Sequence, residues 1–214
     1  MSTRAPRRAE KSKQKRARVV PRAGITPDKI VDVAAHIVDH EGRGALSLAR
    51  VASELGIKTP SLYAHIQGLD HLEGLLKLRG LRELLQHMQR AAVGLARGDA
   101  LHALSDAQRT YAHAHPGLFA FTVRLSEQDA PEVHAAARGM LDVVLAVIRG
   151  YGLEGDDALH ATRALRAATR GFIDLELAGG FGMPLEVDES WRRLLDLLDR
   201  GLQASARGRE KESA

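Results

Sequence analysis

The sequence predicts an all-α protein in which a three-helix N-terminal head is joined by a long helix to a larger helical body. Hydrophobic residues make up 44% of the 214 residues but aromatic residues only 4%, and alanine and leucine are abundant, which favours helices over strands. The segment 47–72, SLARVASELGIKTPSLYAHIQGLDHL, has the apolar spacing and turn residues of two short helices separated by a tight turn. We therefore expect a helix-turn-helix head at 23–70 and a body at 71–206.

Residues 1–22 are expected to form a disordered basic arm. Nine Lys and Arg side chains face a single acid, Glu10, and almost no large apolar side chain is present, so burial cannot offset the entropy of ordering the segment. The formal charge of the chain is +4, so the remainder is roughly neutral to acidic. Such an arm can be a solubilising tail. Beside a helix-turn-helix we favour contact with nucleic acid, with Arg16, Arg18 and Arg22 reaching a minor groove.

The first helix is predicted from its start signals. Thr26 can cap it and Pro27 suits its first position, and the helix should run to about Glu41. Its apolar stripe consists of Ile30, Val31, Ala34, Ile37 and Val38. His36 and His40 are four apart, a spacing that metals can use, but no acid shares their face and we expect both to be exposed.

The two short helices follow. Ser47 is the expected N-cap of the first and Gly56 its left-handed end, while Thr59 and Pro60 suit the start of the second. Leu62 and Ile66 should point back at the first short helix. The outward side of the second then carries side chains able to bond phosphates or base edges, namely Lys58, Thr59, Ser61, Tyr63 and His65.

The segment from residue 25 to about 76 resembles the N-terminal DNA-binding domain of the TetR/AcrR family of bacterial transcriptional regulators. The tract LGIKTPSLYAHI is the specific part of the match. The other matching residues are Ile30, Ala34, Gly42, Ser47, Val51, Ala52 and Leu72. The resemblance implies a two-fold dimer that binds double-stranded DNA at a palindromic operator, most often as a repressor, and that responds to a small-molecule effector of unknown identity. Because no long apolar run and no apolar signal core are present, we expect the protein to be cytoplasmic.

DNA contacts are assigned by residue type together with this resemblance. Tyr63 suits a sugar and phosphate contact, His65 and Lys58 suit phosphates, and the residues 59–61 are left to read bases. That is a limited base code, so DNA shape and the arm should add specificity. Leu69 stands where many family members have a lysine. The expected DNA-contact residues are Ser47, Arg50, Lys58, Thr59, Pro60, Ser61, Tyr63 and His65, with Arg16, Arg18 and Arg22 from the arm.

The remaining helices are expected to form the body. A long connecting helix should run from Leu69 to about Arg97, and Asp99 should cap the next. The later helices are predicted at about 99–115, 117–125, 131–151, 157–178 and 190–204, with a frayed tail at 207–214.

The last two helices are apolar on more than one side. From the residues alone, burial in a large core and a subunit interface are equally good explanations. The resemblance favours the interface, because the family dimerises by packing its last two long helices into a four-helix bundle. The expected interface residues are Leu165, Ala168, Phe172, Leu175, Trp191, Leu194, Leu195 and Leu198.

An effector pocket is the other site that the resemblance implies. Apolar residues on neighbouring body helices are candidates, although any helical body must also bury such residues in its core. They are Tyr111, Phe119, Phe121, Met140, Val144 and Ile148. The tract ATRGFIDLELAGGFGMP further resembles a subset of the family with a Trp-His-Gly signature; only Gly171 of that trio is present, with Arg170 in place of the histidine.

Several classes of function are disfavoured. The absence of cysteine excludes disulfides and thiolate metal sites, and no motif of a nucleotide-binding loop or a hydrolase is present. We expect no enzyme activity, no cofactor, no metal and, since no apolar run approaches ~18 residues, no membrane partner. A sequence-indifferent architectural DNA-binding protein and a helical enzyme or carrier remain the alternatives.

Overall fold

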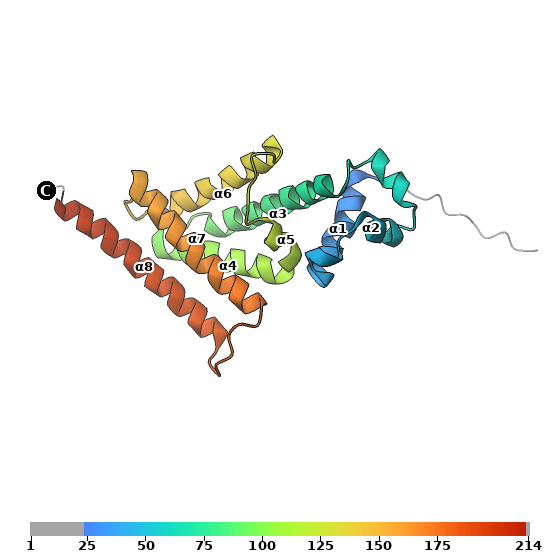
Figure 1. Ribbon diagram of the computed structural model, residues 1–214. Helices are drawn as coiled ribbons and strands as arrows, with labels where there is room; N and C mark the ends of the chain where they lie inside the picture. The colour runs from blue at the N-terminus through green and yellow to red at the C-terminus, as the bar shows by residue number, and fades with distance from the viewer. Residues whose placement is uncertain (1–23, 213–214) are drawn as a thin grey trace, which may run out of the picture.

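The computed structural model describes residues 24–212, which form helices and turns with no β-strand among them. The predicted fold class is confirmed. The molecule is elongated, with α1 and α2 at one end and the C-terminal end of α8 at the other (Figure 1). The helices are α1 (Pro27–Glu41), η1 (Arg43–Ala45), α2 (Leu48–Glu54), η2 (Thr59–Ala64), α3 (Leu69–Ala92), α4 (Arg97–Ala114), α5 (Pro116–Phe121), α6 (Pro131–Arg149), α7 (Gly155–Leu177) and α8 (Val187–Glu212), where η denotes a 3-10 helix.

The head has a hydrophobic core between α1, α2, η2 and the first half of α3, and residues of α5 are also buried in it. The hydroxyl of Thr26 accepts a hydrogen bond from the backbone N–H of Lys29 at 3.3 Å, and Pro27 opens α1 as predicted. The buried residues of this core include Ile30, Ala34, Ile37, Val38, Val51, Ala52, Leu62, Ile66, Leu72 and Leu76.

Helix α3 connects the head to the body. Leu72 and Leu76 belong to the head core, whereas Leu84 and Met88, further along the same helix, belong to the body core. The helix ends at Ala92, five residues before the predicted end. The backbone reverses in the segment that follows, where Gly94 has a φ of +75°.

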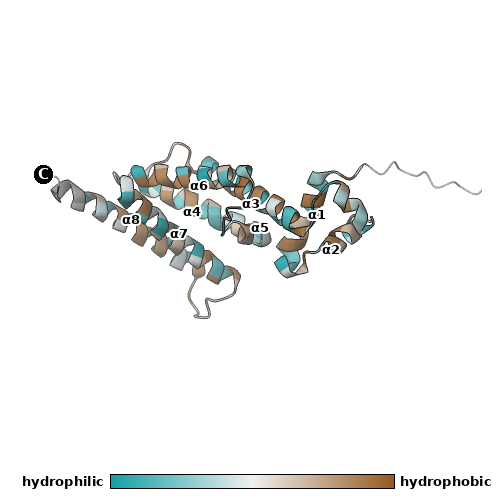
Figure 2. Ribbon diagram, turned by 45° about the horizontal axis from the view of Figure 1, so that its top comes forward, coloured by the Kyte–Doolittle hydropathy of each residue, from teal (hydrophilic) through white to brown (hydrophobic). Residues whose placement is uncertain are grey.

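The body is built around α4, which packs against α3, α5, α6, α7 and α8. Hydrophilic and hydrophobic residues alternate along the body helices, as amphipathic helices require (Figure 2). Arg109 on α4 donates from Nε to Glu176 on α7 at 2.8 Å, and this hydrogen bond lowers the pKa of the Glu176 carboxyl. Burial raises the pKa of Tyr111 well above its usual value, and its hydroxyl donates to Glu83 on α3 at 3.1 Å.

The predicted ends of the body helices need correction. Asp99 is not a cap: α4 begins at Arg97 after Ala96. Helix α5 ends at Phe121 rather than at residue 125, and α7 begins at Gly155. Helix α8 spans 26 residues, from Val187 to Glu212, and so continues well beyond its predicted end at residue 204. Arg, Lys and Glu dominate this extension and favour a helix. None of the described helices is long and apolar enough to cross a membrane.

Candidate nucleic-acid interface

The turn between α2 and η2 is fixed by local chemistry that the sequence predicted. The hydroxyl of Ser47 accepts a hydrogen bond from the backbone N–H of Arg50 at 3.1 Å and caps α2. At the other end, Gly56 has a φ of +65°. The N–H of Ile57 donates to the carbonyl of Ala52 at 3.0 Å and that of Gly56 to the carbonyl of Ser53 at 3.0 Å, which is a Schellman motif.

The second short helix differs in detail from the prediction. It is a 3-10 helix whose N-cap is Lys58, so Thr59 is its first residue and does not cap it. Pro60 therefore occupies the second position, where its fixed φ and missing N–H are still tolerated. The Thr59 hydroxyl is consequently not used for capping.

The predicted orientation of this helix is confirmed. Leu62 and Ile66 are 0% and 1% exposed beneath it, whereas Tyr63 is 60% exposed on the outside. Lys58, Pro60 and Ser61 are also exposed, and His65 is half-buried. The helix thus presents a ridge of hydrogen-bonding side chains to solvent, supported by an apolar underside. We call the surface formed by residues 58–65 the outward ridge.

Arg50 lies beside the outward ridge but already has partners. Its Nη2 is 2.9 Å from a carboxylate oxygen of Glu41 and 2.9 Å from one of Glu54. All three side chains are solvent-exposed, so these ion pairs contribute little to stability. Arg16, Arg18 and Arg22 lie outside the described residues.

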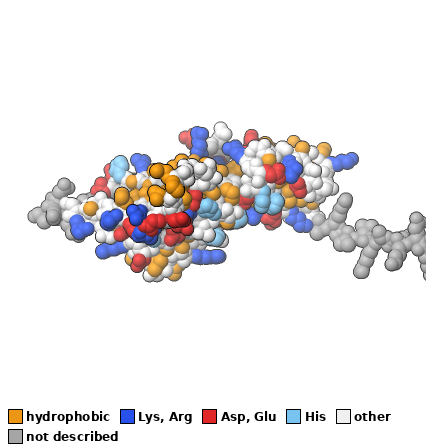
Figure 3. All heavy atoms as spheres, turned by 90° about the horizontal axis from the view of Figure 1, so that it is seen from below, with side chains coloured by type: hydrophobic (Ala, Val, Ile, Leu, Met, Phe, Trp, Pro, Cys, Tyr) orange, Lys and Arg blue, Asp and Glu red, His pale blue; other side chains and the backbone are white. Residues whose placement is uncertain are grey.

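The charge of the head is not that of a strongly basic surface. From residue 24 to residue 68 there is one more acidic than basic side chain. The basic residues are Lys29, Arg43, Arg50 and Lys58, and the acidic ones are Asp28, Asp32, Asp39, Glu41 and Glu54. Acidic and basic groups are also interspersed on the face of the molecule seen in Figure 3. Residues 24–68 therefore supply no net positive charge for attraction to DNA.

The predicted pocket residues are divided between the two hydrophobic cores. Tyr111, Phe119 and Ile148 are buried in the body core, and Met140 and Val144 pack against it. The prediction for Phe121 is corrected, because this residue is buried in the head core and not in the body. The guanidinium carbon of Arg43 lies 5.2 Å from the centroid of its ring.

The predicted interface residues separate into two groups. Leu165, Trp191 and Leu195 are buried within a single chain and belong to the body core, although Leu165 also borders a surface groove. Ala168, Phe172, Leu194 and Leu198 are half-buried, and Leu175 is exposed. Exposed Leu159 and Leu197, which we did not select, lie on the same two helices. A surface groove of about 540 Å³ between α7 and α8 is lined by Leu153, Asp157, His160, Ala161, Ala164, Leu165, Leu197, Leu198, Gly201, Leu202 and Ser205.

His36 and His40 on α1 contact each other. The two rings stack with centroids 4.0 Å apart, and Nδ1 of His40 lies 2.9 Å from the carbonyl oxygen of His36. Both side chains are exposed. Within residues 24–212 no group of three His, Asp or Glu side chains is placed to hold a metal ion.

Similar sequences indicate the class of protein. The HTH-type transcriptional regulator Rv0681 of Mycobacterium tuberculosis is 37% identical over 158 residues, which are 73% of this chain and 72% of that protein. The HTH-type transcriptional regulator YobS of Bacillus subtilis is 32% identical over 170 residues, 79% of this chain and 88% of that protein. With the outward ridge, these relatives define a DNA-binding transcriptional regulator of the helix-turn-helix class.

The body identifies the family. Residues 101–198 match the family described as tetracyclin repressor-like, C-terminal domain. The fold is that of the TetR family protein ActR of Streptomyces coelicolor in complex with (S)-DNPA, with a TM-score of 0.62, 22% identity and coverage of 86% of this chain and 100% of that one. The chain belongs to the TetR family of transcriptional regulators. Its place in the Trp-His-Gly subset stays a prediction.

Proposed function

We propose that this regulator is a cytoplasmic, effector-responsive repressor that binds a palindromic operator as a homodimer. The observation that carries the proposal is the outward ridge, in which Tyr63 and Lys58 project from a helix held by Leu62 and Ile66. Two copies related by a two-fold axis would place their ridges in successive major grooves, about 34–36 Å apart.

The groove between α7 and α8 supports the homodimer. It is lined mainly by apolar and small side chains, and Leu197, 64% exposed, stands at its edge. Ala161, Ala164 and Gly201 leave room for a helix of a second copy to approach closely. Apolar surface of this kind on paired helices is typical of an interface between identical subunits.

Effector response is proposed by analogy of fold, since ActR was solved with a small molecule bound. An effector would act by preferring the state in which the two ridges cannot reach successive grooves. The coupling required is on the order of 1–3 kcal/mol, which is ordinary for allosteric proteins. We propose no catalytic role.

Tyr63→Ala tests the outward ridge. A duplex selected from a random double-stranded DNA library for binding to the full chain, called here the selected duplex, serves as the probe. We expect affinity to fall at least about tenfold, because a hydrogen bond to a charged phosphate contributes about 1.5–3 kcal/mol. Thermal unfolding should be unchanged, since the side chain is exposed. Tyr63→Phe keeps the ring and removes only the hydroxyl, so it should lose a similar amount of affinity if the phosphate hydrogen bond is responsible.

The same measurement separates the alternatives. An architectural protein would bind the selected and scrambled duplexes with a ratio near one at fixed salt. A helical enzyme or carrier would yield no selected duplex, and Tyr63→Ala would leave its activity intact. Either result would refute the proposal.

Deleting residues 1–20 tests the arm. Because the head at 24–68 has more acids than bases, we expect the deletion to weaken binding to selected and scrambled duplexes alike. The slope of log affinity against log salt should become less steep by ~0.9 for each phosphate that the arm no longer neutralises. Binding measured at four or five salt concentrations gives the slope, and an unchanged slope would show that the arm is a passive tail.

A further inference from the structure

Helix α5 contributes to both hydrophobic cores of the molecule. It is only six residues long. Leu118 and Phe121 are buried in the head core, whereas Phe119, between them, is buried in the body core. Together with α3, which also has residues in both cores, it therefore links the position of the head to that of the body.

The N-terminal end of α5 is held by α1 of the head. Oδ1 of Asp39 accepts a hydrogen bond from the backbone N–H of Leu118 at 2.9 Å, and Oδ2 lies 2.9 Å from Nδ1 of His115. At Gly117 the two helices meet backbone to backbone, since a Cβ there would lie 2.2 Å from the carbonyl carbon and oxygen of Val38. No side chain lies between them to absorb a displacement.

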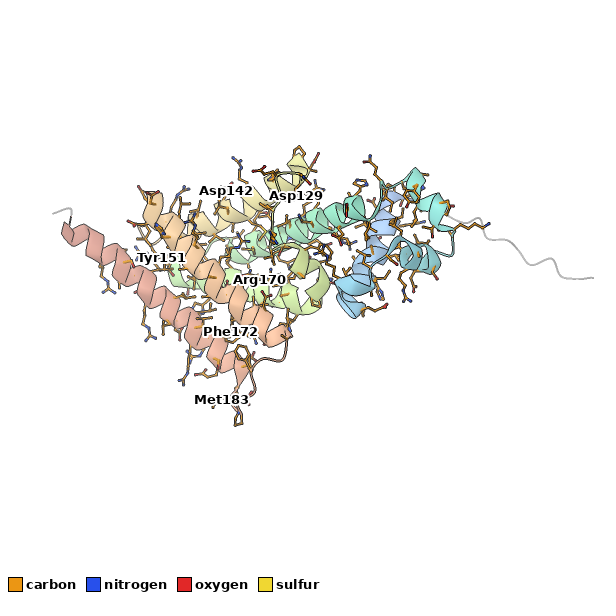
Figure 4. The ribbon with its side chains drawn as sticks, viewed as in Figure 1. Asp129, Asp142, Tyr151, Arg170, Phe172 and Met183 are labelled. Atoms are coloured by element: carbon orange, nitrogen blue, oxygen red, sulfur yellow. The ribbon has the colours of Figure 1, made fainter. Side chains whose placement is uncertain are left out.

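The C-terminal end of α5 is held by Arg170 of α7 (Figure 4). Nη1 of Arg170 donates to the carbonyl oxygen of Phe119 at 3.2 Å and to the hydroxyl of Thr122 at 3.1 Å. The guanidinium carbon lies 3.7 Å from the centroid of the Phe119 ring. Nε donates to both carboxylate oxygens of Asp174 at 2.9 Å, which fixes the orientation of the guanidinium plane.

We propose that Arg170 is a positioning residue for DNA binding, which acts through α5 to set the orientation of the head. This inference rests on the proposed function. Helix α7 also lines the groove assigned above to the second copy, so a shift of α7 would reach α1 through Arg170, α5 and Asp39. The path runs through hydrogen bonds and a backbone contact rather than through loose side-chain packing.

The test compares Arg170→Gln with Arg166→Gln in the full chain. Arg166 is a matched control one turn earlier on α7, because its Nη2 donates to the carbonyl oxygen of Val123, beyond the end of α5, at 3.1 Å. We expect Arg170→Gln to weaken binding to the selected duplex by ~5–150-fold, the range of ordinary allosteric coupling, and Arg166→Gln to change it less than twofold. Arg170→Lys should restore binding only in part, since an ammonium cannot reproduce the planar contacts.

Head position is measured without DNA. The chain has no cysteine, so Lys58→Cys provides one spin label per chain in the head. Pulsed electron paramagnetic resonance on the homodimer should show a shifted or broadened distance distribution in Arg170→Gln and an unchanged one in Arg166→Gln. If the chain is monomeric, a second label at exposed Arg149 reports the same displacement within one chain.

The outcomes distinguish the inference from the proposed function. Unchanged distances and unchanged affinity in Arg170→Gln would overturn the positioning role while leaving a sequence-specific regulator. A loss of unfolding free energy with unchanged distances would show Arg170 to be merely structural and would also overturn it. Failure to select any duplex would refute the proposed function, but shifted distances would still support the placement of the head by Arg170.

Discussion

Gly117→Ala is expected to disrupt the contact between head and body and to abolish specific DNA binding. The new methyl group would lie 2.2 Å from the backbone carbon and oxygen of Val38, and neither atom can move without shifting α1. Overpacking of this kind costs about 1–3 kcal/mol in the free energy of unfolding, and more when backbone must move. Urea unfolding and titration with the selected duplex measure the two effects.

Gly171→Ala is the matched control for this substitution. Gly171 lies within α7 and no heavy atom would lie within 4 Å of its added Cβ. Since alanine is the better helix former, this variant should be more stable by roughly 0.5–1 kcal/mol and should bind DNA normally. Stability in Gly117→Ala equal to that of the parent protein would contradict the close approach of α1 and α5.

Trp191→Ala is expected to cost about 3–5 kcal/mol in the free energy of unfolding, because a large aromatic side chain is removed from a packed core. Trp191 is 3% exposed, its Nε1 donates to Oδ1 of Asp106 at 2.6 Å, and its ring centroid is 5.2 Å from that of Phe172. The substitution also leaves the carboxylate of Asp106 without this donor. Urea unfolding at several protein concentrations separates chain stability from association.

Leu197→Ser provides the contrast, because Leu197 lies on the same helix but is exposed. It should change the stability of the folded chain by no more than about 0.5 kcal/mol and should weaken self-association, as measured by sedimentation velocity. If Trp191→Ala instead dissociates the protein without unfolding it, Trp191 is an interface residue after all.

The features that the sequence predicted well are those determined by neighbouring residues. The caps at Thr26 and Ser47 and the left-handed Gly56 depend on hydrogen bonds and sterics within one turn, and all three are present. The orientation of the outward ridge followed from the spacing of Leu62 and Ile66. Because these rules are local, the sequence alone is enough to predict the candidate DNA-binding surface.

The features that it missed depend on contacts between distant segments. Asp39 and Leu118 are 79 positions apart, and nothing near Asp39 marks it as the partner of a backbone amide in the body. Trp191 and Leu197 both lie on an amphipathic helix, and only the packing of α4 against α8 shows which of them is covered. Phe121 looked like a pocket residue because its placement in the other core could not be inferred from its own helix.

The shared core has a consequence for building chimaeric regulators. Leu118 and Phe121 complete the hydrophobic interior of the head although they lie about fifty residues beyond its last short helix in the chain. A fragment cut after residue 68 would lack these two side chains, together with Leu72 and Leu76, and would expose the apolar surface they cover. Fusing this head to the body of another regulator therefore requires matching residues in that body's equivalent of α5, in addition to a suitable fusion site.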